Sequence, residues 1–189
     1  LEDTFDCGQC FRWTFDGEGW VGVVGTRAVR CIQQENGFII ENSTVEEVEN
    51  FWKIDFDLDR DYTEAIRGFE DDKYLSAAAE FGKGIRILRQ DPLETIISFI
   101  ISSNNNIKRI RGIIDRFCRC YGKSVGSPFG EELYAFPDKE DLLKVTLEGL
   151  EPLRAGFRNK YIMDAVEKIR SGVLVPEDLC EMTTAEASA

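Results

Sequence analysis

The chain has 189 residues, of which 43% are hydrophobic, 11% aromatic and 31% charged, a composition typical of a globular protein. Thirteen Phe, three Trp and five Tyr exclude an intrinsically disordered chain, and no apolar run approaches the roughly 20 residues of a membrane span. The absence of histidine excludes imidazole bases and histidine metal ligands, and six cysteines are too few for a disulfide scaffold, so we expect a cytoplasmic protein in a reducing compartment.

Short aromatic and β-branched runs fill the first 40 residues and predict β-strands. Turn-forming pairs, Asp16-Gly17 and Asn36-Gly37 among them, separate these runs and favour tight reversals between strands. The sequence therefore predicts an antiparallel meander, with strands at residues 9–15, 19–24, 26–33 and 38–40.

Helical spacing begins after Ser43-Thr44, where the apolar stripe consists of Val45, Val48, Phe51 and Trp52. The acidic residues that follow are interpreted as a solvated surface. Asp55, Asp57, Asp59 and Asp61 alternate as calcium ligands do, but this loop lacks the glycine and the closing glutamate of a calcium hand.

Two helices with a polar turn between them are predicted in the second half. Asp91 and Pro92 are typical of a helix start, and the helix that follows is apolar almost all round, which indicates a central position in a core. Residues 102–106 (Ser-Ser-Asn-Asn-Asn) end it, because these side chains favour turns. A second helix begins at Ile107, and its N-terminus beside basic residues suits a phosphate group.

The charge is unevenly distributed along the chain. The formal net charge is −12, which at first sight disfavours DNA binding. Residues 1–91 carry a net −10 and residues 92–189 only −2, while the segment 107–123 is locally +5. Such a segment is either one solvated helix face or a placed cationic surface.

The end of the chain carries a helix-start pattern. Thr183 and Glu186 have the spacing of a capping box, which announces a helix, although the chain stops at Ala189. The first residue is Leu1 and not methionine. We therefore expect the chain to be a piece of a longer protein.

Three segments, in order, resemble one known family. They are Gly8-Gln9-Cys10-Phe11-Arg12-Trp13; Gly84 to Pro92 followed by Ser98 to Ile110; and Leu153 to Tyr161. They closely resemble the 8-oxoguanine DNA glycosylases of the helix-hairpin-helix base-excision repair superfamily. The resemblance spans nearly the whole chain, but the family's hairpin, nucleophilic lysine and downstream aspartate would begin after Ala189.

The resemblance implies a role for individual residues. Gly8 matches the glycine whose carbonyl accepts the N7–H that 8-oxoguanine has and guanine lacks. Asn104 matches the asparagine that fills the space left by the flipped base, and Arg109 and Arg158 match the pair that reads the orphaned cytosine. Phe157 replaces a frequent tyrosine wedge and lacks its hydroxyl. The implied DNA-contacting set is Asn104, Asn105, Asn106, Arg109, Phe157 and Arg158.

The resemblance also implies a fold and an activity. We expect an α+β protein, with an N-terminal antiparallel sheet and flanking helices of the TBP-like type over residues 1–90, then part of an all-α glycosylase domain over residues 91–189. The complete protein would excise 8-oxoguanine opposite cytosine from duplex DNA by base flipping, alone or together with AP lyase strand cleavage. We expect a monomer without metal, cofactor or membrane partner, located in the cytoplasm with the bacterial nucleoid or in a eukaryotic nucleus. No catalytic residue is assigned within this chain, which we expect to be inactive by itself.

Other functions remain as alternatives. Cys7 and Cys10 have redox-motif spacing but open a strand-like run, whereas thioredoxin-like sites need a βαβ setting. Cys118 and Cys120 are poorly spaced for zinc. The strongest alternative is a module without catalysis, which binds DNA or, through its acidic surface, another protein.

Overall fold

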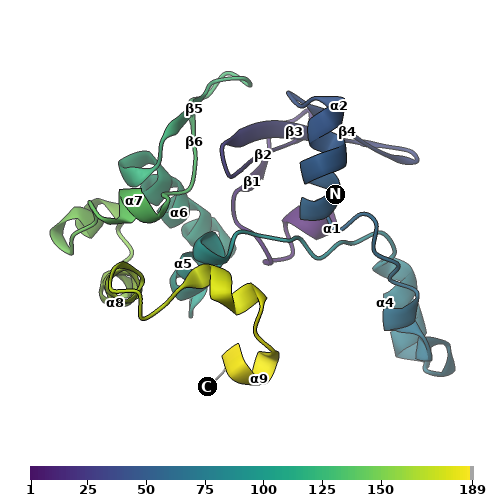
Figure 1. Ribbon diagram of the computed structural model, residues 1–189. Coiled ribbons are helices and arrows are strands. Elements are labelled where there is room, and N and C mark those ends of the chain that lie inside the picture. The colour runs from purple at the N-terminus through teal and green to yellow at the C-terminus, as the bar shows by residue number, and fades with distance from the viewer. Residues whose placement is uncertain (188–189) are drawn as a thin grey trace.

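The computed structural model describes residues 1–187 and has an antiparallel sheet followed by a mainly helical part (Figure 1). The four-stranded sheet has the order β1-β2-β3-β4, and a separate two-stranded sheet pairs β5 with β6. The strands are β1 (Trp13–Phe15), β2 (Trp20–Val24), β3 (Arg27–Gln34), β4 (Gly37–Glu41), β5 (Ser124–Gly126) and β6 (Leu133–Tyr134). This arrangement confirms the predicted α+β class and the meander.

The helices follow in chain order around and after the sheet. Those before residue 90 are α1 (Glu2–Phe5), α2 (Val45–Glu47), η1 (Val48–Trp52), α3 (Lys53–Asp55), η2 (Glu64–Ile66), η3 (Phe69–Asp71) and α4 (Lys73–Phe81). Those after it are α5 (Pro92–Ser102), α6 (Ile107–Tyr121), α7 (Lys139–Leu142), η4 (Glu148–Leu153), α8 (Arg158–Arg170), η5 (Pro176–Cys180) and α9 (Thr184–Ala187). Residues 188 and 189 of the predicted second domain lie outside the described residues.

The sheet register places the large side chain of Trp13 beside a glycine. Trp13 lies opposite Gly22, and a Cβ on Gly22 would come within 2.4 Å of the Trp13 ring. Glycine at this position therefore lets the indole lie flat across β2. The first predicted strand begins too early, because residues 9–12 form an irregular segment and regular pairing starts at Trp13.

The helix after Thr44 is interrupted by one wide turn. Thr44 and Glu47 form a capping box, and α2, η1 and α3 then run without a break, with η1 a π-helical turn. A π turn contains one extra residue and so changes the face on which later side chains lie. Trp52 is fully buried, but Val45 is 80% exposed, so the predicted apolar stripe is wrong at its first residue.

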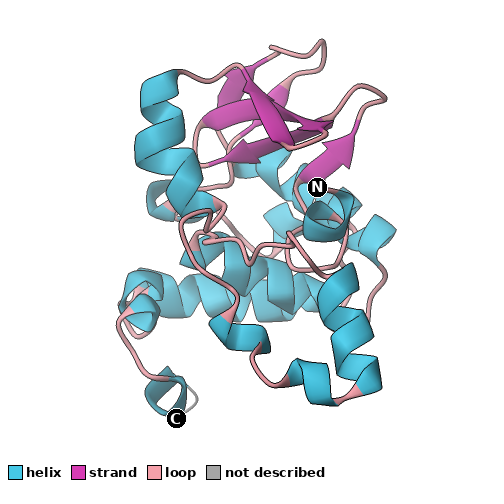
Figure 2. Ribbon diagram, turned by 90° about the vertical axis from the view of Figure 1, so that its right-hand side faces the viewer, coloured by secondary structure: helices cyan, strands magenta, loops and turns pink. Residues whose placement is uncertain are grey.

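The hydrophobic core falls into two clusters. One lies under the sheet, where Phe5 stacks on Trp13 with ring centroids 4.0 Å apart and Trp52 stacks on Phe56. The other joins α5, α6, η4 and α8, as the helical layer below the sheet in Figure 2 illustrates. Two clusters are compatible with the predicted domain boundary at residue 90, which stays a prediction.

Helix α5 is central to the second cluster, but it is not in apolar contact all round. Ile97 and Ile101 are completely buried and α5 packs against α6 and α8, whereas Phe99 is 51% exposed. Asp91 caps α5 and Pro92 occupies its first turn, as predicted. The predicted capping box at Thr183 and Glu186 is also formed and begins α9.

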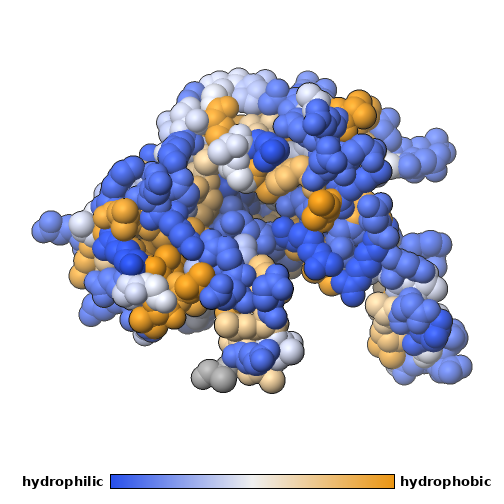
Figure 3. Space-filling model, viewed as in Figure 1, coloured by the Kyte–Doolittle hydropathy of each residue, from blue (hydrophilic) through white to orange (hydrophobic). Residues whose placement is uncertain are grey.

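Helix α4 stands away from both clusters and buries none of its residues. In Figure 3, which has the same view as Figure 1, the part of the molecule around α4 carries hydrophobic residues on the side turned toward the rest of the molecule. Tyr74, Leu75 and Phe81 are its exposed large apolar side chains. Within residues 1–187, no helix is long and apolar enough to cross a membrane.

Candidate nucleic-acid interface

The turn between α5 and α6 presents one asparagine and uses two others to build itself. Asn105 Nδ2 donates to the Ile101 carbonyl at 3.0 Å, and Asn106 caps α6 by accepting from the Arg109 amide at 3.0 Å. Asn104 is exposed, has a φ of 48°, and makes no side-chain hydrogen bond to any described residue. Asparagine tolerates this left-handed conformation better than most residues do. The turn therefore leaves the Asn104 carboxamide available for an external partner.

Arg158 lies behind this turn and supports it. Its Nε and one terminal nitrogen donate to the Ser103 carbonyl at 3.1 and 2.6 Å, and the same terminal nitrogen donates to the Asn104 carbonyl at 2.8 Å. Only 2% of Arg158 is exposed, so its guanidinium replaces the water that these carbonyls would otherwise bind. In this structure Arg158 thus positions the turn from the inside, and its predicted contact with a base stays a prediction.

Phe157 projects an apolar ring beside the same turn. It is 60% exposed, lies under the Arg158 guanidinium at 4.5 Å, and meets Tyr161 edge-on at 6.2 Å. Phe157 directly precedes α8, after the loop in which Arg154 and Gly156 have positive φ. A large exposed ring held between two side chains is available to insert between stacked bases.

The positive charge of α6 and of Lys123, which follows it, is largely engaged within the protein. Arg111 pairs with Asp6 at 2.8 Å, Arg119 with Asp115 at 2.9 Å and Lys123 with Asp138 at 2.5 Å. Arg116 uses its guanidinium to hold the Leu153 carbonyl at 2.8 and 3.0 Å.

The remaining cations lie at the N-terminal end of α6 and around the start of α8. Lys108, Arg109, Arg154 and Lys160 are exposed and form no ion pair within the described part of the chain. Among the described residues, the Arg109 side chain has one hydrogen-bond partner, the Arg154 carbonyl at 3.4 Å. The cationic surface that can attract a phosphate is therefore much smaller than the net charge of +5 on segment 107–123 suggests.

Gly8 lies in the loop that follows α1. Its φ is +89°, a conformation that side chains other than glycine rarely adopt, and a Cβ there would meet nothing within 4 Å. No described residue donates a hydrogen bond to its carbonyl. The Arg111–Asp6 pair ties this loop to α6, two residues before Gly8. A sequence pattern could not reveal this tie, because its members lie 105 residues apart.

A well-formed cavity lies elsewhere in the structure. It has a volume of about 360 Å³ between β1, β2, α6 and the β5–β6 hairpin, and none of the seven predicted site residues lines it. The candidate interface is thus an exposed turn and loop surface and not an enclosed pocket.

The alternatives based on metals and thiols have no matching geometry. Among residues 1–187 no group of three or more carboxylates or cysteines could hold a metal ion. Asp57, from the alternating acidic run, accepts from Tyr62 at 2.8 Å and pairs with Arg89 at 3.0 Å. Burial raises the pKa of Cys10 and of Cys118 to about 12, which keeps both thiols protonated and poorly nucleophilic.

The sequence of this chain is similar to those of known proteins. The sequence model of one protein family, the 8-oxoguanine DNA glycosylase N-terminal domain, matches residues 1–96. An N-glycosylase/DNA lyase of Arabidopsis thaliana is 32% identical over 175 residues, which cover 89% of this chain and 48% of the relative. The N-glycosylase/DNA lyase of Saccharomyces cerevisiae is 30% identical over 184 residues, which cover 89% of this chain and 49% of the relative.

A solved structure agrees over nearly the entire chain. The 8-oxoguanine glycosylase/lyase of Clostridium acetobutylicum, in complex with duplex DNA containing cytosine opposite 8-oxoguanine, superposes with a TM-score of 0.92 and 39% identity. The match covers 99% of this chain and 64% of that one. The chain spans about half the length of the two curated relatives above.

Proposed function

The chain belongs to the 8-oxoguanine DNA glycosylase family, and we propose that the complete protein removes 8-oxoguanine paired with cytosine from duplex DNA. A glycosylase must take its target base out of the stack, which leaves a gap and an unpaired cytosine. The proposal therefore requires a surface that fills a gap, contacts an orphaned base and separates stacked bases.

The observation that carries the proposal is the convergence of such groups at one turn. The Asn104 side chain makes no hydrogen bond to any described residue, the guanidinium of Arg158 holds the Asn104 carbonyl, and Arg109 lies in the first turn of the adjoining helix. Phe157 is exposed immediately before Arg158. We propose that Asn104 enters the space of the flipped base, that Arg109 and Arg158 contact the cytosine, and that Phe157 is the apolar wedge.

Gly8 is proposed to recognise the extruded base. Guanine and 8-oxoguanine differ at N7, which carries a proton only in the oxidised base. A carbonyl held against N7 accepts a hydrogen bond from the lesion and is left unpaired by guanine, and such unpaired polar groups are costly. The Gly8 carbonyl, to which no described residue donates, and the open space at its Cα support this assignment.

We assign no nucleophile to residues 1–189. Attack on the sugar needs a lysine whose pKa is lowered. The carboxylates of Glu49 and Asp138 instead raise the pKa of Lys53 and Lys123. We propose that base excision, with or without strand cleavage, is a property of the complete protein, which acts as a monomer on DNA in the nucleoid or the nucleus.

Borohydride trapping tests the proposal directly. The complete protein is incubated with a duplex that contains 8-oxoguanine opposite cytosine, and with the same duplex containing guanine. We expect base excision and a covalent adduct only on the damaged duplex, and no adduct from residues 1–189 alone. Binding without excision by the complete protein would instead indicate a DNA-binding module.

A further inference from the structure

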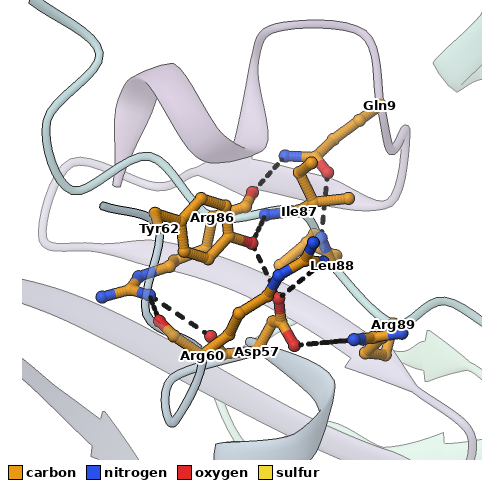
Figure 4. A network of polar contacts seen from close by, with 8 residues as sticks. All are labelled: Gln9, Asp57, Arg60, Tyr62, Arg86, Ile87, Leu88 and Arg89. Carbon is orange, nitrogen blue, oxygen red and sulfur yellow. Dashed lines mark hydrogen bonds and ion pairs between the residues drawn. The ribbon is translucent and has the colours of Figure 1, made fainter. Parts of the chain in front are cut away.

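Gln9, the residue after Gly8, is fixed by both ends of its carboxamide (Figure 4). Its Nε2 donates to the carbonyls of Thr4 and Arg86, both at 2.9 Å. Its Oε1 accepts from the amide of Leu88 at 3.0 Å. All three partners are main-chain groups, so the contacts depend on the Gln9 side chain and not on the identity of its partners.

Gln9 takes the place of a neighbouring strand for the segment 86–89. The Arg86 carbonyl and the Leu88 amide face Gln9, whereas the Ile87 amide points the other way and donates to the Tyr62 hydroxyl at 3.1 Å (Figure 4). Main-chain groups of a β-strand alternate between two edges in this manner. One carboxamide, which both donates and accepts, thus completes the edge that a peptide group would otherwise fill.

The far edge of this segment is anchored in turn. Tyr62 donates to Asp57 at 2.8 Å, and Arg89 donates to the other oxygen of Asp57 at 3.0 and 3.1 Å. Arg86 donates to the Arg60 carbonyl at 2.9 Å. The segment that Gln9 contacts is therefore held from both sides and provides a firm support.

The same contacts restrain the main chain on either side of Gly8. Before it, Gln9 Nε2 binds the Thr4 carbonyl at the end of α1 and closes the loop over residues 4–9. After it, the Gln9 carbonyl accepts from Gln90 Nε2 at 2.6 Å. Gly8 lies between these fixed points, so the direction of its carbonyl follows from them.

We propose that Gln9 is a positioning residue for base discrimination and that it orients the Gly8 carbonyl toward the N7–H of the extruded base. This inference rests on the proposed function. Glutamate at this position keeps the acceptor for the Leu88 amide but replaces the donor with a carboxylate facing two carbonyls. Asparagine is one methylene shorter and does not span the same gap.

The test compares Gln9→Glu with Gln34→Glu in the complete protein. Gln34 lies exposed at the end of β3, and no described residue hydrogen-bonds its side chain, so the control makes the same chemical change without the contacts. Two quantities are measured at each variant: the single-turnover excision rate on 8-oxoguanine paired with cytosine, and the dissociation constant for a tetrahydrofuran abasic analogue opposite cytosine. The analogue has no base and therefore does not use the Gly8 carbonyl.

We expect Gln9→Glu to slow excision roughly ten- to a hundredfold, because small displacements of a recognition group have effects of this size. Affinity for the abasic analogue should stay within about twofold, which is about 0.4 kcal/mol, since Asn104, Arg109 and Arg158 are untouched. The deficit relative to wild type should shrink as the pH is lowered, because the carboxyl group introduced by this substitution regains a donor once it is protonated. Gln34→Glu should change neither quantity.

Several results would overturn the inference. Equal losses of excision and of abasic-analogue binding would mean a general structural role, and unchanged excision would mean no role. If Gln9→Glu does not fold, the same two quantities are measured for Gln9→Met, which removes the hydrogen bonds without adding charge. The same criteria then decide whether Gln9 is a positioning residue. A wild-type protein that binds but does not excise would overturn the proposed function itself.

Discussion

Arg12 donates to Glu94 at 3.1 Å, and this ion pair joins the segment before β1 to the first turn of α5. The two side chains are only 9% and 16% exposed. Arg12 also donates to the Tyr134 carbonyl, so its guanidinium connects the four-stranded sheet region, α5 and the β5–β6 hairpin. Burial raises the pKa of Glu94 even though Arg12 opposes that shift. Glu94 would therefore be a costly residue without its partner.

Replacing Arg12 with Met should destabilise the protein strongly. Removal of one member of a buried ion pair leaves an unpaired buried charge, which costs about 3–5 kcal/mol. Urea unfolding of the complete protein at pH 7 measures this change. The matched control is Lys168→Met, because Lys168 pairs with Asp164 on the surface, with 53% and 60% exposure, where about 1 kcal/mol or less is expected. Similar losses in both variants would contradict a special role for the buried pair.

The sequence predicted local structure well where short-range chemistry decides it. The reversal between β3 and β4, the Asp91 cap with Pro92 and the Thr183 capping box are all contained within a few residues, and each is formed. The first of these is displaced by one residue, because Gln34 pairs with Gly37 and the turn is centred on Glu35 and Asn36 and not on the Asn36-Gly37 pair. The turn at Asn104 is also explained by local chemistry, since short polar side chains favour turns.

Long-range partners could not be predicted in this way. The contact of Arg158 with DNA stays a prediction, but no local pattern shows that its guanidinium is buried against carbonyls 54 and 55 residues earlier in the chain. Gln9 was expected to begin a strand, but its side chain binds residues 77 and 79 positions away. The net charge of segment 107–123 overstates the charge available to DNA. Asp6 and Asp138, which lie outside that segment, neutralise part of it.

Asp55 should make stability depend on pH. Burial, and then the nearby Glu94, raise the pKa of Asp55 from 3.8 to about 7. Between these values the folded protein holds a proton that the unfolded chain has lost, so the free energy of unfolding falls as the pH rises from about 4 to about 7. The part due to Asp55 amounts to about 4 kcal/mol at most, at 1.36 kcal/mol per pKa unit.

The comparison with Asp55→Asn isolates this effect, because Glu94 is present in both proteins. We expect the stability of wild type relative to the variant to decline between pH 4 and 7 in urea titrations. Asp61→Asn is a control of opposite sign, since the contacts to Thr63 lower the pKa of Asp61 and their contribution is lost as the pH falls. A difference between wild type and Asp55→Asn that does not vary with pH would show that Asp55 ionises normally.

Asn104 and Asn106 should separate DNA binding from stability. Asn106→Ala removes the cap of α6 and should lower the free energy of unfolding by roughly 0.5–2 kcal/mol. Asn104→Gly keeps a residue that accepts the positive φ, so stability should change little, whereas affinity for a duplex with an abasic site should fall. Unfolding curves and fluorescence anisotropy on the same samples measure both effects. A Gly variant with unchanged affinity would exclude Asn104 from the interface.

Arg109 and Arg119 lie on the same helix but should differ in their effect on DNA. Arg119 is paired with Asp115, while Arg109 has no acidic partner among residues 1–187, so only Arg109 is available to DNA. If Arg109 reads the cytosine, Arg109→Ala in the complete protein should reduce the preference for 8-oxoguanine opposite cytosine over adenine by roughly 1–3 kcal/mol. If it contacts only a phosphate, binding should weaken equally on both duplexes and the log–log salt slope should fall by about 0.9. Arg119→Ala should leave both quantities unchanged, and a loss of preference in that variant would contradict the assignment of the interface to the N-terminal end of α6.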